Sequence, residues 1–304
     1  LPAILTKLLK KLTLSKRHHY IPEFYIKGFV GNDGKVSVYN KKLGRIDSNR
    51  KSPKQVFFEW NRNTYNVHGE ETDFVEKLYQ FGEDKFSPIY RKLTERLEEI
   101  ELTAKDLFHL ILFIADIHWR VPNQDNEVSN HVKNLNPENS VFTIKSKITG
   151  ENAPKELFDR IINEPSFIGS YRIIMAMQDY FGVERDSSLN NWKIYYAPKQ
   201  DNHPHLLCDN PLIIKKKHEE NILKSELIFP LSKSKIIYHT LGKHLKEIPP
   251  ENRVSTDVLL FLQADNLVCG PDAAYLNSIA NLASIYDAEW KIELLKNEVF
   301  NIFE

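Results

Sequence analysis

The chain has 304 residues, a length typical of one large domain or of two closely packed ones. Hydrophobic residues make up 41% of it, which excludes an intrinsically disordered chain because a sizeable core can form. Lys and Arg together number 41, as do Asp and Glu, so nucleic-acid binding would need a local basic patch. Cys208 and Cys269 form no CxxC pair. We expect both to be buried, and we expect a cytoplasmic protein.

The first residues, LPAILTKLLKKLTL, combine apolar side chains with Lys7, Lys10 and Lys11. This stretch is too short to span a bilayer, which needs roughly 20 residues, and it lacks the cleavage site of a secretory signal. We predict that residues 1–17 form a basic amphipathic arm that docks on the protein, or that contacts phosphates or lipid headgroups. Residues 18–304 are predicted to form a single α+β domain, with a sub-division near residues 185–190 as the alternative.

The first predicted elements are two strands and a long helical region. Residues 34–40 alternate apolar and polar side chains directly after an Asn-Asp-Gly turn, which predicts a strand of a hairpin. Residues 55–58 are a second candidate strand. Residues 70–100 are rich in charge and place apolar residues at helical spacing. Because a Ser-Pro pair at 87–88 is a good helix start, this region predicts either two helices or one kinked helix.

The clearest helix follows, over Leu107–Trp119. Its side chains are apolar almost all round, which predicts a central buried helix. Thr103 and Asp106 resemble a capping box that begins it, and Pro122 ends it. Residues 124–151 are polar and rich in Asn, and we expect a long excursion with some local structure.

The last part of the chain alternates between helical and β-type patterns. Residues 166–181 have helical spacing, and short β-type runs separated by turn residues occupy 192–240. Residues 254–268 and 272–283 return to helical spacing. The order of strands, helices, strands and helices predicts an α+β fold. We expect a helix-rich core with an antiparallel sheet built from an N-terminal hairpin and a C-terminal block of short strands.

The most distinctive local sequence is HHYIP at residues 18–22. A residue before proline is pushed out of the helical region, so this segment is predicted to be extended. His18 and His19 then point to opposite faces. Either imidazole is a candidate general acid–base or metal ligand. The alternative is a polar and aromatic plug that holds the first strand against the helices.

The same segment carries a family resemblance. HHYIPEFYIKGF (18–29) followed by DGKVSVYNK (33–41) resembles the N-terminal signature of domain-of-unknown-function family 4238. Later pieces match in order, and they are RVP at 120–122, CDNP at 208–211, IFPLS at 228–232 and LN at 276–277. The resemblance covers nearly the whole chain from His18 onward, and Cys208 stands where Ser or Thr is expected. It implies no established catalytic role for any residue.

The predicted buried helix carries a polar stripe. At 100° per residue, His109, Phe113, Asp116 and Arg120 fall on one narrow face. Asp116 and Arg120 are an i,i+4 pair in the favourable order. Charged groups on an apolar helix must be paired or line a cavity. The pair is therefore either a structural ion pair at the helix end, or a site where Arg120 faces an anionic ligand and Asp116 holds it in place.

Asp209 ends an apolar strand and precedes Asn210 and Pro211, which is the pattern of a turn. A carboxylate at a strand end is also suited to binding a divalent cation or orienting a histidine. His203 and His205 share strand parity with Asp209. No complete ligand set with zinc-like spacing is present, so a divalent metal stays an alternative without a ligand motif.

Several standard catalytic motifs are missing from the sequence. There is no GxxxxGK[ST], GxGxxG, GxSxG or HExxH. The strand that contains Glu226 lacks the lysine that a restriction-type nuclease would place two residues later. The remaining enzymatic hypothesis is a nuclease-like hydrolase that acts on a phosphodiester or other anionic substrate.

In this hypothesis His18 or His19 transfers protons, and Arg120 stabilises negative charge. Asp209 orients the histidine or holds a metal. The supporting residues are Tyr20, His109, Asp116, Asn210 and Asn277. All of them would have to gather around one cleft.

The alternative function is a non-catalytic module that binds nucleic acid or protein. Aromatic residues between 24 and 65 would stack bases, and neighbouring basic residues would contact phosphates. The aromatic residues are Phe24, Tyr25, Phe57, Phe58, Trp60 and Tyr65, and the basic ones are Arg45, Arg50, Lys51, Lys54 and Arg62. The competing interpretation is that these are ordinary core aromatics with surface charges around them. An oligomeric partner is not indicated by any pattern.

Overall fold

A computed structural model describes residues 14–67, 69–95, 103–183, 189–197, 203–218 and 221–303. Residues 1–13 of the predicted arm, and residues 184–188 at the predicted sub-division, lie outside the described part. The predicted α+β fold class is confirmed, because helices and antiparallel sheets occupy separate stretches of the chain. None of the described helices is long and apolar enough to cross a bilayer.

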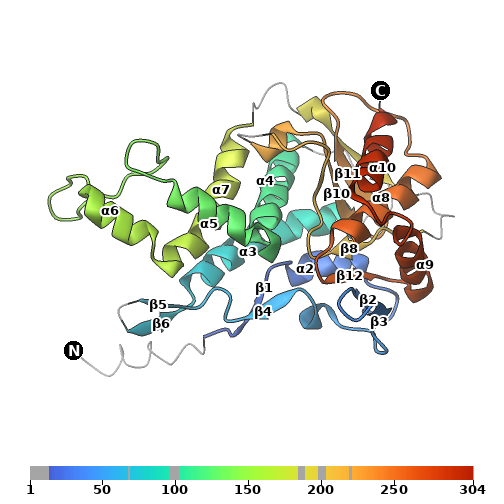
Figure 1. The fold of residues 1–304 in the computed structure, drawn as a ribbon, viewed down its shortest axis with the longest axis horizontal. Helices are drawn as coiled ribbons and strands as arrows, with labels where there is room; N and C mark the ends of the chain where they lie inside the picture. Colours follow the sequence, from blue (N-terminus) through green and yellow to red (C-terminus); the bar gives the residue numbers. More distant parts are fainter. Residues whose placement is uncertain are drawn as a thin grey trace.

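The middle of the chain forms a helical layer (Figure 1). Its helices are α3 (Phe74–Glu95), α4 (Ala104–Arg120), α5 (Asp125–Lys133), α6 (Lys155–Ile162) and α7 (Pro165–Phe181). The helix α4 begins as predicted, because the Thr103 hydroxyl accepts from the Asp106 amide at 3.1 Å. It ends where Val121 is extended before Pro122.

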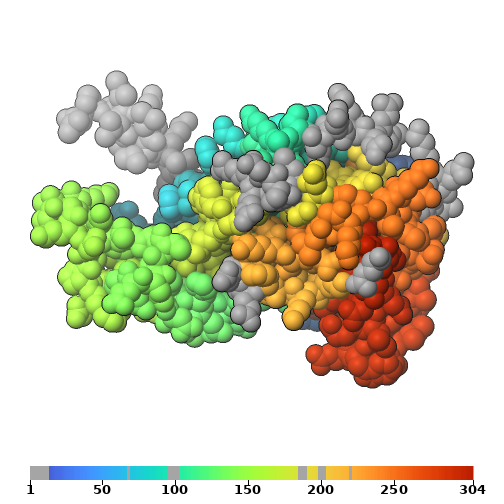
Figure 2. Space-filling model, turned by 90° about the horizontal axis from the view of Figure 1, so that it is seen from above, coloured from blue at the N-terminus to red at the C-terminus, as the bar shows by residue number. Residues whose placement is uncertain are grey.

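The C-terminal helices lie at the other end of the molecule, where they appear red in Figure 1. They are α8 (Pro250–Gln263), α9 (Ala273–Ala283) and α10 (Glu289–Asn301). Figure 2 shows the green residues of α5 and α6 at one end and the red C-terminal helices at the opposite end. A short helix α2 (Glu23–Ile26) follows the HHYIP segment. Single 3-10 turns cover Lys27–Phe29, Pro53–Gln55, Pro122–Gln124, Leu189–Asn191 and Ile222–Lys224.

Two four-stranded antiparallel sheets connect these layers. One has the order β3-β2-β12-β8, and the other has the order β7-β11-β10-β9. The first contains β3 (Arg45–Ile46), β2 (Ser37–Asn40), β12 (Leu267–Gly270) and β8 (Leu207–Cys208). The second contains β7 (Trp192–Tyr196), β11 (Lys235–His239), β10 (Leu227–Ser232) and β9 (Ile213–Ile214). The predicted N-terminal hairpin therefore shares a sheet with C-terminal strands, but most of the C-terminal block forms a sheet of its own.

Two small antiparallel pairs complete the strands. They are β1 (Arg17–His19) with β4 (Phe58–Trp60), and β5 (Tyr65–Val67) with β6 (Glu70–Thr72). The extended conformation predicted for the two histidines is confirmed by β1. The β6 strand shows that one prediction was wrong, because residues 70–72 were expected to begin a helix.

Two further expectations are now defined in detail, and a third was wrong. The region expected as two helices or a kinked one is a single helix, α3, which keeps Pro88 inside it. The polar excursion after residue 124 begins with a regular helix, α5. The helical pattern over 254–268 ends at Gln263, and Leu267–Gly270 is a strand between β2 and β8. Leu267 and Val268 are drawn into this sheet by backbone pairing that no local periodicity encodes.

An aromatic core joins the N-terminal motif to both layers. Tyr25 from α2 stacks on Phe229 of β10 at 5.3 Å between ring centroids, and Phe86 stacks on Phe113 at 4.1 Å. The buried Tyr25 hydroxyl donates to the Pro230 carbonyl. Stacked and edge-on aromatic pairs each add roughly 0.5–1.5 kcal/mol beyond their burial. Two separate signature segments, HHYIPEFY and IFPLS, therefore meet in the core.

Candidate functional site

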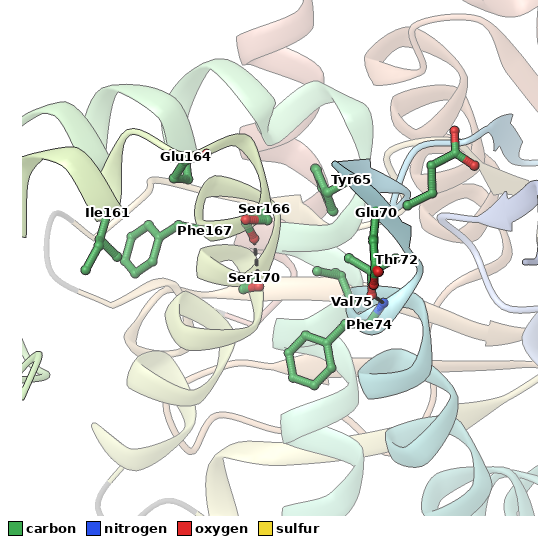
Figure 3. A pocket seen from close by; sticks show the side chains of 11 residues that line it. Tyr65, Glu70, Thr72, Phe74, Val75, Ile161, Glu164, Ser166, Phe167 and Ser170 are labelled. Atoms are coloured by element: carbon green, nitrogen blue, oxygen red, sulfur yellow. Dashed lines mark hydrogen bonds between the residues drawn. The ribbon is translucent and has the colours of Figure 1, made fainter. Parts of the chain in front are cut away.

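Two hollows and one polar network contain some of the candidate functional residues, and the others lie elsewhere in the fold. The first hollow is an open groove of 840 Å³, which we call the hairpin groove. One wall comes from β5, β6 and the start of α3, and the other comes from α6 and α7 (Figure 3). Its lining residues are Tyr65, Glu70, Glu71, Thr72, Phe74, Val75, Ile161, Glu164, Ser166, Phe167 and Ser170.

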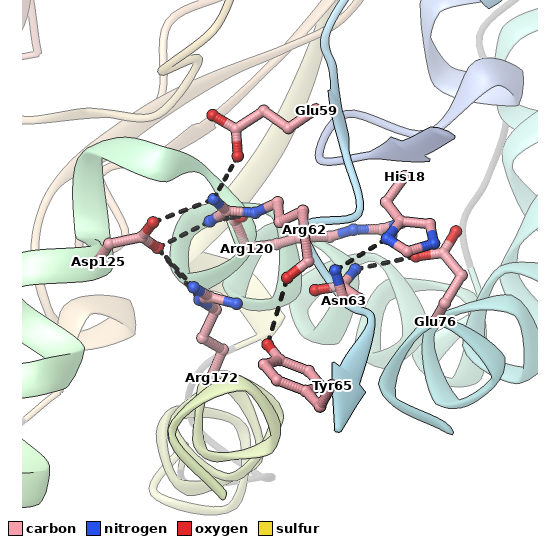
Figure 4. A network of polar contacts seen from close by, with 9 residues as sticks. All are labelled: His18, Glu59, Arg62, Asn63, Tyr65, Glu76, Arg120, Asp125 and Arg172. Atoms are coloured by element: carbon pink, nitrogen blue, oxygen red, sulfur yellow. Dashed lines mark hydrogen bonds and ion pairs between the residues drawn. The ribbon is translucent and has the colours of Figure 1, made fainter. Parts of the chain in front are cut away.

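The polar network begins at His18, which is fully buried (Figure 4). Its Nδ1 accepts from the Asn63 amide at 2.8 Å, and its Nε2 lies 2.8 Å from the Ser15 carbonyl. The Asn63 side chain in turn donates to Glu76 at 2.9 Å. Both ring nitrogens of His18 are therefore occupied by the backbone, which ties β1 to the turn after β4.

Arg120 is the centre of the network and is only 1% exposed. Its guanidinium donates to Glu83 at 2.7 Å and to the backbone carbonyl of His19 at 2.6 Å. The same group lies 4.1 Å from the ring centroid of Tyr79. The Asp116 pair predicted from the sequence is present at 4.0 Å. Glu83 on α3, which sequence spacing did not identify, is the closer partner.

His19 points to the other side of β1, as the extended backbone requires. Its Nδ1 lies 3.9 Å from Glu23, and its ring packs 5.7 Å from that of Phe58. Burial lowers the pKa of His19, while Glu23 opposes this shift and Arg120 adds to it. The Nε2 atom has no hydrogen-bond partner among the described residues. His19 and Arg120 therefore meet, but through the backbone of His19 rather than its ring.

The rest of the network was not identified as a site from the sequence. Arg62 donates to both carboxylate oxygens of Asp125, at 2.7 and 3.0 Å, and to Glu59 at 2.7 Å. Arg172 on α7 reaches the same Asp125 at 2.9 Å. Figure 4 shows Asp125 between the two guanidinium groups. The only local signal was an acid at the start of α5, directly after the RVPNQ segment.

Asp209 lies outside the Arg120 network, makes its own set of contacts and is 3% exposed. Its carboxylate accepts from the backbone amides of Asp265, Asn266 and Leu267 at 2.9, 2.7 and 2.9 Å. Burial raises the pKa of Asp209, and the three amides oppose that shift. No contact among the described residues joins its side chain to Arg120 or to His19. The turn interpretation of CDNP agrees with this geometry.

The supporting residues are spread over the fold. Tyr20 is buried, and its amide donates to the Phe57 carbonyl at 3.0 Å. The Asn210 carbonyl accepts from the Gln263 side chain, and Asn277 is exposed on α9 at the far end of the molecule. These residues share no cleft with Arg120. Their roles as site residues stay predictions.

A metal centre is not formed by the described residues. No group of three or more His, Cys, Asp and Glu side chains there is arranged to hold a metal ion. His205 faces Asp257 at 3.9 Å rather than Asp209. The strand parity that suggested a shared His and Asp site is therefore not realised in this part of the chain.

The predicted aromatic and basic face divides into core and surface. Tyr25 and Phe57 are buried in the core, as the competing interpretation expected. Trp60 is 62% exposed, and the guanidinium of Arg17 lies over its ring at 5.1 Å and over Phe58 at 4.4 Å. The surface part is therefore an Arg17–Phe58–Trp60 stack on the β1–β4 pair.

The second hollow is a pocket of 410 Å³ among α3, α4 and α7, which we call the three-helix pocket. It contains His109 and Asp116, two residues of the stripe predicted on α4. Its lining residues are Leu78, Tyr79, Phe81, Gly82, Glu83, Lys85, Phe86, His109, Leu112, Phe113, Asp116, Ile173, Ala176 and Met177. Most are apolar, and the charged members come only from α3 and α4.

The inner polar groups of this pocket are those that surround Arg120. Burial raises the pKa of Asp116 to about 6, with Arg120 opposing the shift and Glu83 adding to it. The hydroxyl of Tyr79 is buried and has no hydrogen-bond partner among the described residues. His109 lies nearer the start of α4, where its Nδ1 is 2.6 Å from the Lys105 carbonyl. A carboxyl group with a shifted pKa in an apolar pocket is a recognised mark of a functional site.

These observations define an α+β protein whose signature segments, including HHYIPEFY, RVP and IFPLS, are held together by buried hydrogen bonds and aromatic contacts. The chain belongs to the family described as protein of unknown function (DUF4238), whose model matches residues 17–260. The resemblance seen in the sequence is thereby confirmed. A search of curated proteins and a search of solved structures each returned no match.

Proposed function

We propose that the protein binds a compact apolar molecule that carries a protonated amine, in the three-helix pocket. The volume of 410 Å³ lies within the range of small-molecule sites, roughly 300–1,000 Å³. Apolar walls with a few polar groups at one place are the usual composition of such sites. The observation that carries the proposal is the pair of carboxylates, Glu83 and Asp116, that share one buried arginine, Arg120.

The charge balance selects the sign of the ligand. Arg120 contacts Glu83 at 2.7 Å but Asp116 only at 4.0 Å, so one carboxylate is poorly compensated. Burial is the main cause of the raised pKa of Asp116, and Arg120 at 4.0 Å does not offset it. An ammonium group beside Asp116 would supply the second positive charge. An anionic ligand would meet both carboxylates, because Arg120 itself is sealed from solvent. Lys85, the other cation of the lining, is exposed and lies over the Phe81 ring.

The expected result is a preference among ligands of equal length. At pH 7.5, n-heptylamine should bind about tenfold more tightly than 1-heptanol, because a charged hydrogen bond contributes roughly 1.5–3 kcal/mol. Heptanoate should bind least. Affinity for the amine should fall at pH 5, where Asp116, with its pKa of about 6, is mostly protonated. Isothermal titration calorimetry measures each constant.

Three variants make this test specific. Gly82 lines the pocket, and a Cβ built there meets no atom within 4 Å. Gly82→Trp should therefore fill the pocket and abolish binding, while Gly82→Ala keeps the space and strengthens the helix by about 1 kcal/mol. Asp116→Asn should lose most of the pH dependence. Equal affinities for amine, alcohol and carboxylate, or binding unaffected by Gly82→Trp, would refute the proposal.

A second candidate function is binding of single-stranded nucleic acid at the Arg17–Phe58–Trp60 stack. An exposed tryptophan beside an arginine is a surface on which bases stack. Lys16 and Lys54 are exposed next to it and would contact phosphates. Arg17 also donates to the Lys54 carbonyl at 3.1 Å, which holds the guanidinium in place.

Trp60→Ala should weaken binding of an oligothymidylate about tenfold or more at 50 mM salt, because one base–aromatic stack contributes roughly 1–3 kcal/mol. Trp290→Ala is the matched control, since Trp290 is an equally exposed tryptophan on α10. Fluorescence anisotropy at rising salt measures the affinity. Absence of binding at 50 mM salt, or equal losses in both variants, would exclude this function.

Hydrolysis of a phosphodiester by His18 or His19, Arg120 and Asp209 stays a prediction without support from this geometry. His18, Arg120 and Asp209 are buried and bonded within the protein. A catalytic group must come within hydrogen-bond reach of the substrate.

A further inference from the structure

We infer that residues 1–13 bind intramolecularly in the hairpin groove, with their apolar face on its aromatic wall and their lysines on its glutamates. This gives the docking predicted for the basic arm a specific surface. It is independent of the function proposed for the three-helix pocket. Three features of the molecule support it: the composition of the groove, the place where the arm joins the fold, and the pattern of the arm.

The hairpin groove has apolar side chains and one sign of charge. Phe74, Val75, Ile161 and Phe167 line it together with three glutamates, and no Lys or Arg is among the described residues that line it. The three glutamates are Glu70, Glu71 and Glu164, and all are exposed. Figure 3 shows Phe167 on one wall and Phe74 on the other. Phe74 is 56% exposed although it begins a helix whose other face is buried.

The arm joins the fold at the edge of this groove. Burial alone would raise the pKa of Asp73, but hydrogen bonds from Lys77 and from the backbone of Ser15 bring it below its usual value, so Ser15 lies beside Asp73, directly before α3. The next residue after Asp73 is Phe74, which lines the groove. The Ser15 carbonyl is also held at 2.8 Å by His18. The tether is therefore fixed beside the groove, and no extra linker is needed to reach it.

The sequence of the arm complements both the apolar side chains and the negative charge of the groove. At 100° per residue, one face of about 100° collects five of the apolar side chains, which are Leu1, Ile4, Leu5, Leu8 and Leu12, and Leu9 lies just beyond its edge. Lys7, Lys10 and Lys11 fall on the adjoining face, and residues 1–13 contain no acid. Thirteen residues of helix extend about 20 Å. An amphipathic helix in an apolar groove is a common recognition mode, and a tethered segment has a high effective concentration there.

Disulfide trapping in the full chain tests the inference. The two native cysteines are fully buried and will not compete. The variant Leu8→Cys with Ser166→Cys places one thiol on the arm and one in the groove. Leu8→Cys with Ser278→Cys is the control, because Ser278 is exposed on α9 at the far end of the molecule. Mild oxidation should give an intrachain disulfide in most molecules of the first variant and in few of the second.

Charge reversal tests the electrostatic part of the inference. Replacing Lys7, Lys10 and Lys11 with glutamate should lower the trapping yield severalfold at low salt. Adding Glu70→Lys and Glu71→Lys to the reversed arm should restore it. A yield unchanged by the reversal contradicts the pairing. A disulfide between chains rather than within one assigns the groove to a second copy and also overturns the inference.

Hydrogen exchange provides a measurement that needs no cysteine. In the unmodified chain, the amides of residues 70–75 and 166–170 should exchange severalfold more slowly than in the Leu5→Glu, Leu8→Glu variant. Residues 273–283 serve as the internal control and should not change. Equal exchange in both proteins would mean that the arm does not cover the groove.

Discussion

Arg120→Ala is expected to lower the free energy of unfolding by about 3–5 kcal/mol. The guanidinium is buried, and its loss would leave the Glu83 carboxylate without its 2.7 Å partner and the His19 carbonyl without its donor. Removal of one partner of a buried ion pair is strongly destabilising, because the remaining charge stays away from water without compensation. Urea unfolding followed by circular dichroism measures the change.

A second set of substitutions separates the loss of the ion pairs from the loss of the arginine side chain itself. Arg120→Met with Glu83→Gln and Asp116→Asn removes all three charges and should recover a substantial part of the loss, because no partner is then left without compensation. Arg45→Ala is the matched control, since Arg45 is an exposed arginine on β3. Its effect should stay within about 0.5 kcal/mol. A loss below about 1 kcal/mol for Arg120→Ala would show that the network is not structural.

Asp209→Ala is the second substitution with a large expected effect, a loss of roughly 3–5 kcal/mol in the free energy of unfolding. Its carboxylate is the acceptor for three consecutive backbone amides, those of residues 265–267. Without it, three donors at the junction between α8 and β12 lose their partner. The junction positions β12 between β2 and β8, so we expect weakened pairing of that sheet as well.

Asp209→Asn should lose an intermediate amount, because the amide keeps one of the two acceptor oxygens. Asp84→Ala, at an exposed aspartate of α3, is the control and should be nearly neutral. Chemical unfolding gives the stabilities, and hydrogen exchange of residues 267–270 reports on the strand. A stable, well-folded Asp209→Ala protein would contradict the structural role and would return Asp209 to consideration as a catalytic residue.

The elements that were predicted correctly have local causes. The start of α4 follows from the Thr103 and Asp106 capping box, and its end follows from Pro122. The extended His18–His19 segment was predicted from Pro22, but the proline restricts only Ile21, and pairing with β4 holds the two histidines extended. The stripe on α4 was also readable, because side chains at helical spacing share a face whatever surrounds them. His109, Phe113 and Asp116 do line one pocket.

The errors arise where a distant segment decides the outcome. Leu267–Gly270 is a strand because β2 and β8 pair with its backbone and Asp209 holds the residues before it. The closest partner of Arg120 is Glu83, on another helix. Hydrogen bonds between segments far apart in the chain leave no periodic trace. The same reason concealed the link from Arg62 through Asp125 to Arg172, whose members belong to three separate segments.

The sequence by itself determined the fold class, the membership of a family, the position of the buried helix and the face on which its polar residues lie. Capping, proline restriction and hydrophobic period act within a few residues, so a single chain displays them directly. Only the tertiary structure decided that Arg120 and Asp209 belong to separate, buried contact sets, and that Glu83 and Asp116 share one arginine at an apolar pocket. Those relations depend on which distant segments pack together, because burial and ion pairing are properties of the assembled fold.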